Sequence, residues 1–325
     1  MNIGIDIMGG DYAPEEAIKG VVSFLESESA SKKNVHIMLF GNPDVARPYI
    51  ESRLQANWAD RFTLVPSFSV IGMQEHPTKA LKEKADSSIS IGFDYLQKGK
   101  IDAFISAGNT GAMLVGAMYS VKAIPGVLRP TIASPIPKLN GRYNFLLDVG
   151  ANADCKPEHL VQFALMGALY ARHILRLDNP RVALLNLGEE EGKGNLLAQA
   201  TYPLLKQHSS INFIGNCEGR DMFTDMADVI VCEGFTGNVA LKMAESIYHI
   251  FTEQRHIQDA FLEQFNYEIY GGTPILGVNA PVLIGHGISN QTAFHSMMTT
   301  AKKLVESKLT DIIRQHFAEL SVDPS

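Results

Sequence analysis

Cysteine is scarce in this sequence, and the cysteines that occur are not grouped. The 325 residues include 3 cysteines, Cys155, Cys217 and Cys232, and no two of them form a CxxC pair. A disulfide framework and a zinc knuckle both need paired or clustered cysteines, so neither is expected. The sequence fits a protein of a reducing compartment.

Positive charge is also in short supply. The chain has 28 Lys and Arg against 35 Asp and Glu, which gives a net charge of −7. Nonspecific binding to nucleic acid needs a basic stripe, so no nucleic-acid partner is expected, and an acidic protein partner would need a local basic patch. A hydrophobic content of 46% with 19% charged residues excludes the disordered and fibrous classes.

Neither a signal peptide nor a membrane span is apparent. The chain opens with the strand-like Asn2–Ile7 instead of a basic segment followed by an apolar one. The most apolar long stretch, Gly111 to Leu128, contains Lys122 and Pro125, and we interpret it as a buried helix. The sequence therefore predicts a protein that is soluble or bound at a membrane surface.

Two nucleotide-binding motifs are absent. No GxGxxG with a following acidic residue occurs, which disfavours a nicotinamide dehydrogenase, and no GxxxxGK[ST] phosphate loop occurs. The segment Gly188 to Asn195 resembles such a loop only superficially. Lys193 lies between two glycines there, directly after a predicted strand at 181–187, and it is a candidate functional cation.

One pattern occurs twice in the chain. Residues 102–112 and residues 228–238 each begin with an acidic residue and a short apolar run that stops at glycine, and each continues through Thr-Gly into a helical stretch. This pattern predicts a buried strand, a tight turn and a helix N-terminus. Backbone N–H groups without partners and the helix dipole favour an anion at such a turn, so we expect a phosphate site.

The two copies are too far apart for a solenoid repeat. They are better explained as related strand–helix units, one in each half of a doubly wound sheet, with the ligand cleft at the strand ends. The first copy has Asn109 beside Thr110, whereas the second has Phe235 at the equivalent position. We therefore assign phosphate to the first copy and the opposite wall of the cleft, with Asn238 and Lys242, to the second.

The segment from Lys242 to Tyr270 has a different pattern. Its apolar residues fall mostly at helical spacings with a polar break around 253–256, which predicts an amphipathic helix pair or a kinked helix. Ordinary core packing, a dimer arm and a membrane-surface contact are all open interpretations. Phe261 and Phe265 are the side chains expected to make the dimer or membrane contact.

Seven motifs, in register from residue 3 to about residue 300, resemble those of the bacterial phosphate acyltransferase (PlsX) family of phospholipid synthesis. The motifs are Met8-Gly9-Gly10-Asp11 with Ala13-Pro14, Ser106-Ala107-Gly108-Asn109-Thr110-Gly111-Ala112, Asp148-Val149-Gly150-Ala151-Asn152, Gly188-Glu189-Glu190, Gly234-Phe235-Thr236-Gly237-Asn238, Tyr270-Gly271-Gly272 and His286-Gly287. Segment 79–85 departs from the pattern, because it carries lysines where the family tends to have arginine.

The resemblance implies a fold and a reaction. The fold would be a three-layer α/β/α sandwich with a largely parallel, doubly wound sheet, similar to isocitrate dehydrogenases and phosphotransacetylases, forming a single domain over residues 1–325 with a helical arm at 243–270. The reaction would convert acyl-[acyl carrier protein] and inorganic phosphate into acyl phosphate and free carrier protein, with no cofactor and no metal. The nearest alternative is a phosphotransacetylase that uses acyl-coenzyme A, and a non-catalytic membrane-surface scaffold for lipid enzymes is a further one.

The resemblance also implies partners and a location. A membrane glycerol-3-phosphate acyltransferase would consume the product, and the protein would be a cytoplasmic homodimer associated peripherally with the inner face of the cell membrane.

Phosphate is already an anionic nucleophile at neutral pH, so the chemistry needs positioning and oxyanion stabilisation more than a strong base. The predicted site residues form three groups. Catalytic roles are expected for Lys193, His286 and Asn109; phosphate binding for Asn109, Thr110, Gly111, Ser87 and Ser88; and positions in the substrate cleft for Asp6, Gly9, Gly10, Asp11, Asp148, Asn152, Asn186, Asn238 and Lys242. His286 in its Gly-His-Gly turn could equally be structural, and Cys155 and Cys232 are not expected to act as nucleophiles.

Overall fold

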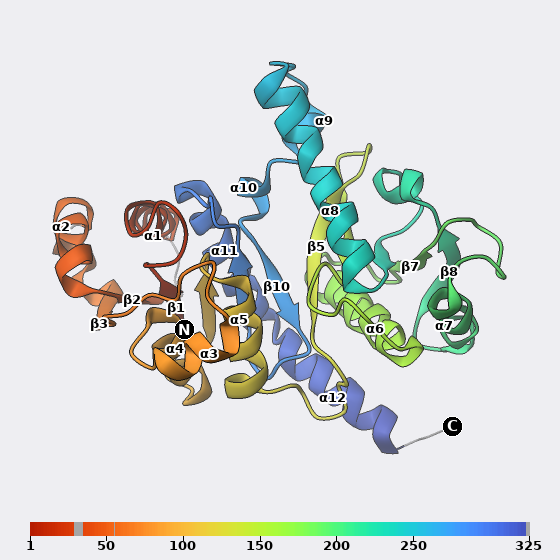
Figure 1. Cartoon of the computed structure of the whole chain (residues 1–325), viewed down its shortest axis with the longest axis horizontal. Coiled ribbons are helices and arrows are strands. Elements are labelled where there is room, and N and C mark those ends of the chain that lie inside the picture. The colour runs from red at the N-terminus through yellow and green to blue at the C-terminus, as the bar shows by residue number, and fades with distance from the viewer. Residues whose placement is uncertain (29–34, 55, 323–325) are drawn as a thin grey trace. The chain divides into compact units, whose positions relative to one another are not determined.

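The computed structural model describes residues 1–28, 35–54 and 56–322 (Figure 1). These residues form two compact units, which we describe one at a time. Unit 1 contains Met1–Ala123 and Tyr267–Glu306, and unit 2 contains Ile124–Asn266 and the chain from Ser307 onward. The sequence predicted one domain, and the two copies of its repeated pattern lie in different units.

The sheet of unit 1 is parallel except at one edge. Its strands lie in the order β3-β2-β1-β4-β11-β10, and only β10 runs antiparallel to its neighbour β11. The strands are β1 (Asn2–Asp6), β2 (His36–Gly41), β3 (Phe62–Pro66), β4 (Ala103–Ser106), β10 (Gly272–Leu276) and β11 (Val282–Gly285). Every residue of β4 and β11 is buried, so both faces of the sheet are covered there.

Small residues allow helices to pack closely on this sheet. A Cβ atom at Gly92 of α4 would lie 2.2 Å from the Phe104 ring of β4, and a Cβ atom at Gly285 of β11 would lie 2.8 Å from Met297 of α11. The helical segments of unit 1 are α1 (Glu15–Ser27), α2 (Pro43–Arg53), η1 (Ala56–Arg61), α3 (Pro77–Glu83), α4 (Ser88–Gln97), α5 (Thr110–Gly116), η2 (Ala117–Val121), α10 (Tyr267–Tyr270) and α11 (Gln291–Ser307).

The strands of unit 2 are arranged in the same way. Its strands lie in the order β5-β6-β9-β7-β8, and only β5 runs antiparallel to its neighbour β6. The strands are β5 (Thr131–Pro137), β6 (Tyr143–Leu147), β7 (Arg181–Leu185), β8 (Asn212–Cys217) and β9 (Val229–Val231). The helical segments are α6 (Pro157–His173), α7 (Leu196–Gln207), η3 (Gly219–Phe223), α8 (Gly234–Tyr248), η4 (His249–Gln254), α9 (Ala260–Glu263) and α12 (Leu309–Val322).

The predicted fold class is confirmed. The strands of each unit are largely parallel, and helices cover them. Both copies of the repeated pattern form the predicted strand, turn and helix, as β4–α5 in unit 1 and β9–α8 in unit 2. Helix α6 is buried over most of its length, as its uniformly apolar sequence predicts, and it packs on β6, β7 and β9.

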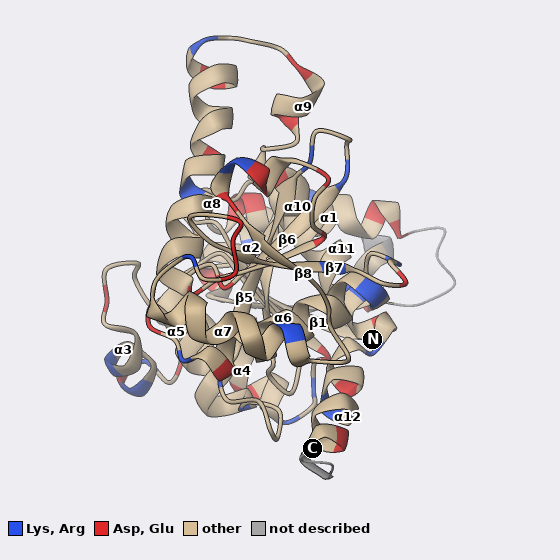
Figure 2. Cartoon of the chain, turned by 90° about the vertical axis from the view of Figure 1, so that its right-hand side faces the viewer, with Lys and Arg blue, Asp and Glu red and all other residues tan. Residues whose placement is uncertain are grey.

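The segment that follows the second copy is a kinked helical arm. Helix α8 continues into η4, which ends at Gln254 within the predicted polar break, and the short α9 follows. Figure 2 shows this part of unit 2 extending beyond its sheet, with charges of both signs around its tip. Helix α10, which the sequence placed in the same arm, belongs to unit 1.

Phe261 and Phe265 are not the exposed side chains of this arm. Phe265 is only 5% exposed, and its ring lies 5.5 Å from the ring of Phe223 and 5.2 Å from that of Phe261. Phe265 is therefore buried under half-buried rings, so the prediction of a contact surface at Phe265 is wrong. The exposed apolar side chains of the arm are instead those of Met243, Ile250, Phe251 and Ile257.

A buried lysine joins three segments at the amino-terminal end of the parallel strands of unit 2. Lys138 is 1% exposed, and its Nζ lies 2.9 Å from Asp228 Oδ1 and 3.1 Å from Asp225 Oδ1. The guanidinium of Arg181 also contacts both carboxylates. Burial acts to raise the pKa of Asp228, but its hydrogen bonds from Arg181 and Lys138 outweigh burial and hold that pKa well below its usual range.

Within the described residues, none of the helices combines the length and the apolar composition that crossing a membrane requires.

Candidate functional site

Three turns of unit 1 meet at the carboxyl ends of parallel strands. They follow β1, β4 and β11, which are neighbours in the sheet and run in the same direction. Ligands of α/β sheets bind at this edge, where loops leave the strand ends. The turns contain most of the predicted residues of unit 1, namely Asp6, Gly9, Gly10, Asp11, Asn109, Thr110, Gly111 and His286.

Asp6 joins these turns from inside the protein. Its carboxyl group is 1% exposed, and it accepts hydrogen bonds from Ser106 Oγ at 2.7 Å and from the backbone N–H of Met8 at 2.9 Å. Burial raises the pKa of Asp6, and hydrogen bonds from Ser106, Ser88, Met8 and Gly9 partly offset that rise. With these donors on its oxygens, Asp6 holds the turns together instead of facing a ligand.

The two glycines after β1 permit this close approach. A Cβ atom at Gly9 would lie 2.5 Å from Asp6 Oδ2 and 2.7 Å from the backbone nitrogen of Gly108. Gly10 has a φ of +98°, a conformation that other residues rarely adopt. The N–H of Asp11 then donates to the carbonyl oxygen of Gly287 at 2.7 Å, so the turns after β1 and β11 are bonded to each other.

Asn109 is committed to the scaffold. Its Oδ1 accepts from Ala112 N–H at 2.9 Å, which caps α5, and its Nδ2 donates to the carbonyl oxygens of Gly72 at 2.9 Å and Glu75 at 3.1 Å. The side chain is 5% exposed. The direct hydrogen bond to phosphate that the sequence suggested for its amide would therefore have to break these contacts, and the geometry makes Asn109 a positioning residue.

The first turn of α5 leaves donors available next to Asn109. Among the described residues, the backbone N–H groups of Thr110 and Gly111 have no hydrogen-bond partner. Thr110 is exposed, and a Cβ atom at Gly111 would lie 2.4 Å from the ring of Pro77 in α3. The helix start is therefore open toward solvent at Thr110 and closely packed against α3 at Gly111.

Ser87 and Ser88 are both buried, at 0% and 1% exposure. Ser87 caps α4 through Ser90, and Ser88 donates to Asp6. The hydroxyls of both serines are thus engaged within the protein, and the phosphate contact that the sequence suggested for them would have to replace these hydrogen bonds. In the preceding lysine-rich segment, Lys84 is occupied by an ion pair with Glu75 and a hydrogen bond to the carbonyl oxygen of Val70.

His286 is an exposed side chain of the turn after β11. Its ring packs against that of Tyr267, with centroids 5.2 Å apart, and its carbonyl oxygen accepts from the backbone and hydroxyl of Ser289. The backbone of the turn is therefore fixed, while the imidazole remains accessible to a ligand.

Asp148 plays the same part in unit 2 that Asp6 plays in unit 1. It is 0% exposed, and it accepts from the N–H groups of Ile132 at 3.0 Å and Asn152 at 2.7 Å and from Asn152 Nδ2 at 2.8 Å. Burial raises the pKa of Asp148, and these hydrogen bonds partly offset the rise. Asn152 also donates to the carbonyl oxygen of Pro130, so Asp148 and Asn152 both support the turn.

The start of α8 lies directly on this turn. A Cβ atom at Gly237 would be 1.8 Å from the carbonyl oxygen of Asp148, so only glycine fits. Asn238 Nδ2 donates to the carbonyl oxygen of Val149 at 3.1 Å, and Glu233 caps the helix by accepting from Thr236 N–H at 2.9 Å. Phe235, at 67% exposure, projects from the first turn of α8.

The loop after β7 presents Lys193 to solvent. Asn186 donates to the carbonyl oxygen of Lys193 at 3.1 Å, and it accepts from Leu187 N–H at 2.8 Å, which closes the loop. Lys193 and Lys242 are both exposed, and in the part of the chain that the structure describes neither ammonium group has an ion-pair partner. Asn186 is thus a support of the loop, and the two lysines are available to an anionic ligand.

Sequence reasoning missed the segment from Gly72 to Glu75. The amide of Asn109 holds this segment beside α5, and Met73 within it is 49% exposed and lies near Gly287. The segment has no periodic pattern, and its only signal was Pro77 at the first position of α3.

The cysteines are poorly suited to nucleophilic catalysis. Burial, reinforced by the charge of Asp148, raises the pKa of Cys155 to about 11, and burial raises the pKa of Cys232 well above its usual range. Both are therefore thiols at neutral pH, whereas the thiolate is the reactive form.

The raised pKa of Cys155 predicts how its alkylation depends on pH. Between pH 7 and pH 10 its rate of reaction with iodoacetamide should rise about tenfold per pH unit, because the thiolate fraction increases until the pH reaches a pKa of about 11. Mass spectrometry of digested samples measures the rate at Cys155, with glutathione as the control thiol. A rate that levels off below pH 9 would contradict the raised pKa.

Comparison with known proteins agrees with this architecture. A sequence model described as "Fatty acid synthesis protein" matches residues 1–311. The phosphate acyltransferase of Thermoanaerobacterium thermosaccharolyticum is 39% identical, with 100% of this chain and 99% of the relative covered. The phosphate acyltransferase of Halothermothrix orenii is 40% identical, with 97% and 98% covered.

Solved structures show the same fold at low sequence identity. The EutD phosphotransacetylase from Staphylococcus aureus matches with a TM-score of 0.62 at 14% identity, covering 94% of each chain. A phosphotransacetylase from Streptococcus pyogenes matches with a TM-score of 0.63 at 14% identity, covering 96% of this chain and 94% of that one. The full-length sequence matches decide the family: the chain belongs to the bacterial phosphate acyltransferases and is an acyltransferase enzyme.

Proposed function

We propose that this enzyme transfers a fatty acyl group from acyl-[acyl carrier protein] to inorganic phosphate and that the acyl phosphate product serves phospholipid synthesis. The observation that carries the proposal is the identity of about 40% to phosphate acyltransferases over nearly the whole chain. The available N–H groups of Thr110 and Gly111 support it, because they suit the phosphate substrate.

The reaction needs little covalent chemistry from the protein. An oxygen of hydrogen phosphate attacks the thioester carbonyl carbon, the new C–O bond forms, and the C–S bond breaks. The proton of hydrogen phosphate ends on the departing thiolate, so the products are acyl phosphate and free thiol. Positioning of phosphate and stabilisation of the oxyanion are the contributions that an enzyme can make to such a step.

Each proposed role follows from the local geometry of one unit. In unit 1, Thr110 and Gly111 would bind phosphate through backbone N–H groups, and Asn109 would keep that helix start in place. His286, exposed beside this turn, would relay the proton of hydrogen phosphate to the leaving thiolate or donate a hydrogen bond to the oxyanion. In unit 2, the ammonium group of Lys193 is the alternative candidate for stabilising the oxyanion.

An acidic carrier protein as acyl donor is supported by the free cations of unit 2. The chain is acidic overall, so such a partner needs a local basic surface. Lys193 and Lys242 are exposed cations, and the exposed apolar side chains of Leu187, Leu196 and Phe235 lie in the same unit. Acyl-coenzyme A is the alternative donor, favoured by the fold shared with phosphotransacetylases.

The choice of donor is directly testable. With purified enzyme and saturating phosphate, kcat/KM for palmitoyl-[acyl carrier protein] should exceed that for palmitoyl-coenzyme A by at least about tenfold, equivalent to about 1.4 kcal/mol of transition-state binding. Acyl phosphate is trapped as the hydroxamate. A higher kcat/KM for the coenzyme A thioester would establish the phosphotransacetylase alternative instead.

Thr110→Pro tests the phosphate site without removing the helix start. Proline is favoured at the first helical position, and Asn109, with φ −59° and ψ 108°, has a conformation compatible with a following proline. The variant lacks the N–H group, so KM for phosphate should rise about 10- to 100-fold, as for loss of a hydrogen bond to an anion.

Thr110→Ala is the matched control, because it removes the hydroxyl but keeps the N–H group. Its KM for phosphate should change less than that of Thr110→Pro. If the proline variant and the unmodified enzyme have the same KM for phosphate and the same circular dichroism spectrum, the N–H group of Thr110 is excluded from the site.

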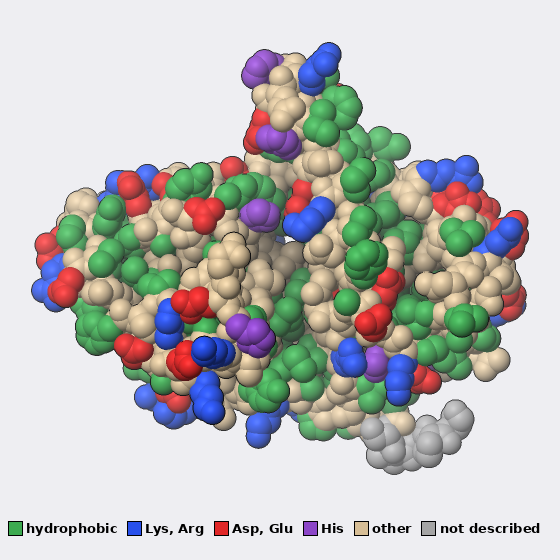
Figure 3. All heavy atoms as spheres, viewed as in Figure 1, with side chains coloured by type: hydrophobic (Ala, Val, Ile, Leu, Met, Phe, Trp, Pro, Cys, Tyr) green, Lys and Arg blue, Asp and Glu red, His purple; other side chains and the backbone are tan. Residues whose placement is uncertain are grey.

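We further propose that the arm contacts a second copy of the chain or the cytoplasmic membrane surface. Phe235, Val239 and Met243 are 67%, 50% and 65% exposed, and their spacing places them on one face of α8. Figure 3 shows hydrophobic side chains gathered along α8 and its continuation. An exposed apolar stripe of this kind is typical of a protein or membrane interface. Membrane contact would bring acyl phosphate close to the membrane glycerol-3-phosphate acyltransferase that would consume it.

Replacement of Ile250 and Phe251 by serine tests the arm. Each is 43% exposed, so the pair contributes little to the interior, and the thermal midpoint should stay within a few degrees. Dimer dissociation in sedimentation velocity, or loss of cosedimentation with anionic vesicles, is expected. Val45→Ser with Val70→Ser, two exposed apolar residues of unit 1, is the control. A variant that keeps both its dimer and its vesicle binding would exclude this part of the arm.

A further inference from the structure

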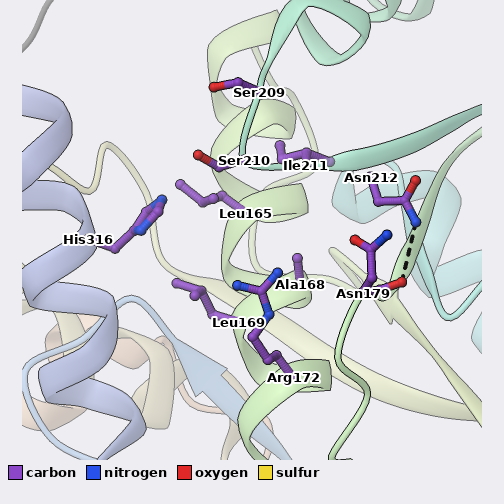
Figure 4. A pocket seen from close by; sticks show the side chains of 10 residues that line it. All are labelled: Leu165, Ala168, Leu169, Arg172, Asn179, Ser209, Ser210, Ile211, Asn212 and His316. Atoms are coloured by element: carbon purple, nitrogen blue, oxygen red, sulfur yellow. Dashed lines mark hydrogen bonds between the residues drawn. The ribbon is translucent and has the colours of Figure 1, made fainter.

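Unit 2 contains a cavity that none of the predicted site residues lines. Its volume is about 450 Å³, and it lies between α6, α12 and the segment that leads into β8 (Figure 4). The residues that line it are Leu165, Ala168, Leu169, Arg172, Asn179, Ser209, Ser210, Ile211, Asn212 and His316. The volume is in the range of small-molecule sites.

This cavity is at the opposite end of the strands from the Asp148 turn. Asn179 precedes β7, and residues 209–211 precede β8, whereas Asp148 and Asn186 follow β6 and β7. Because β6, β7, β8 and β9 are parallel, the cavity borders the amino-terminal edge of the sheet. A five-residue strand such as β7 separates the two edges by about 16 Å.

The charge of the cavity favours an anion. Arg172 donates through Nε to the carbonyl oxygen of Asp178 at 3.2 Å, which orients the guanidinium, and over the described ranges it forms no ion pair. None of the described residues that line the cavity is acidic, although the protein as a whole carries a charge of −7. A guanidinium with free donors suits the two oxygens of a carboxylate or phosphate group.

Further donors face the same space. Figure 4 shows the guanidinium of Arg172 and the ring of His316 projecting from α6 and α12 into the space between these helices, with Ser210 on the segment that leads into β8. Within the described structure, Nε2 of His316 is enclosed and has no hydrogen-bond partner. An enclosed polar atom without a partner is unusual in proteins and indicates that a ligand or ordered water belongs near it.

The remaining wall is apolar. Leu165, Ala168, Leu169 and Ile211 contribute only hydrocarbon to the cavity, so an inorganic anion alone would leave part of it unmatched. A ligand that combines an oxyanion with a small apolar body would contact both walls.

We propose that this cavity is a second binding site, specific for a small organic oxyanion, a phosphate monoester or a carboxylate with an apolar part. Arg172 and His316 bind the oxyanion, Ser209 and Ser210 add hydroxyl donors, and the leucines of α6 contact the apolar body. The site does not depend on the acyl-transfer reaction.

A neighbouring cavity shows that the cationic wall is particular to the first one. It has a volume of about 430 Å³, shares Leu165, and is lined otherwise by residues such as Val161, Leu204 and Phe317, with Glu158 and His208 as its titratable groups. Burial lowers the pKa of His208, which disfavours its charged form. An anion has no cationic partner there among the described lining residues. Of these two cavities, the first therefore combines apolar surface with a cation that has no ion-pair partner among the described residues.

Hydrogen–deuterium exchange of the full-length enzyme tests this site by location. Phenyl phosphate, phenylacetate and benzyl alcohol serve as probes at millimolar concentration, and the readout is protection of amides in 209–217 and 309–320. We expect phenyl phosphate, phenylacetate or both to slow exchange in these segments, and benzyl alcohol to leave it unchanged. Protection near Thr110 would report binding at the reaction site and is scored separately.

Arg172→Gln should raise the probe concentration needed for half-maximal protection at least about tenfold, as loss of a charge-assisted hydrogen bond predicts. Arg176→Gln is the matched control, since it makes the same charge change four residues away and does not line the cavity. Equal loss in the two variants, equal protection by benzyl alcohol, or no protection by either oxyanion would overturn the proposal.

Discussion

Two buried carboxylates, one in each unit, organise the edges at which the predicted site residues lie. Asp6 ends β1 and Asp148 follows β6. Each accepts a hydrogen bond from its own turn and one from a neighbouring strand, Ser106 of β4 for Asp6 and Ile132 of β5 for Asp148. Removing a carboxylate from water is costly, so its oxygens must be fully hydrogen-bonded inside the protein. That requirement fixes the positions of the turns after β1, β4 and β6 and leaves little freedom to the residues between them.

The same constraint explains why many polar residues of the motifs do not face a ligand. Asn109, Asn152, Asn186 and Asn238 all use their amides to hold neighbouring backbone. The groups left for a ligand are those that the scaffold does not need, which are the backbone N–H groups of Thr110 and Gly111, the imidazole of His286 and the ammonium groups of Lys193 and Lys242. An enzyme whose nucleophile is already anionic can work with such a set, because binding and charge stabilisation matter more than a strong base.

The repeated strand–turn–helix element serves different purposes in the two units. In unit 1, Asn109 caps α5 and leaves polar donors exposed at the helix start. In unit 2, Glu233 caps α8, and the exposed position is taken by Phe235, the first of an apolar stripe along the helix. An acidic cap makes the start of α8 less suited to an anion, since it places negative charge at the positive end of the helix dipole. The local architecture is shared, while the surface that each copy presents differs.

The sequence by itself determined the strand–turn–helix order, the burial of α6, the kink of the arm and the glycines at close approaches, because periodicity, caps and glycine positions are local signals. It also determined the family, because the seven motifs can be recognised in the sequence, in the family's order, without any structure. Only the tertiary structure decided that Phe265 is interior, that Asn109 supports the 72–75 segment, and that Arg172 and His316 border one cavity. Those facts depend on which residues, distant in the chain, share a hydrogen bond or an apolar contact, and one sequence contains no local signal for such pairs. Whether a polar side chain serves the scaffold or a ligand is decided by its partners, and the partners are set by the fold.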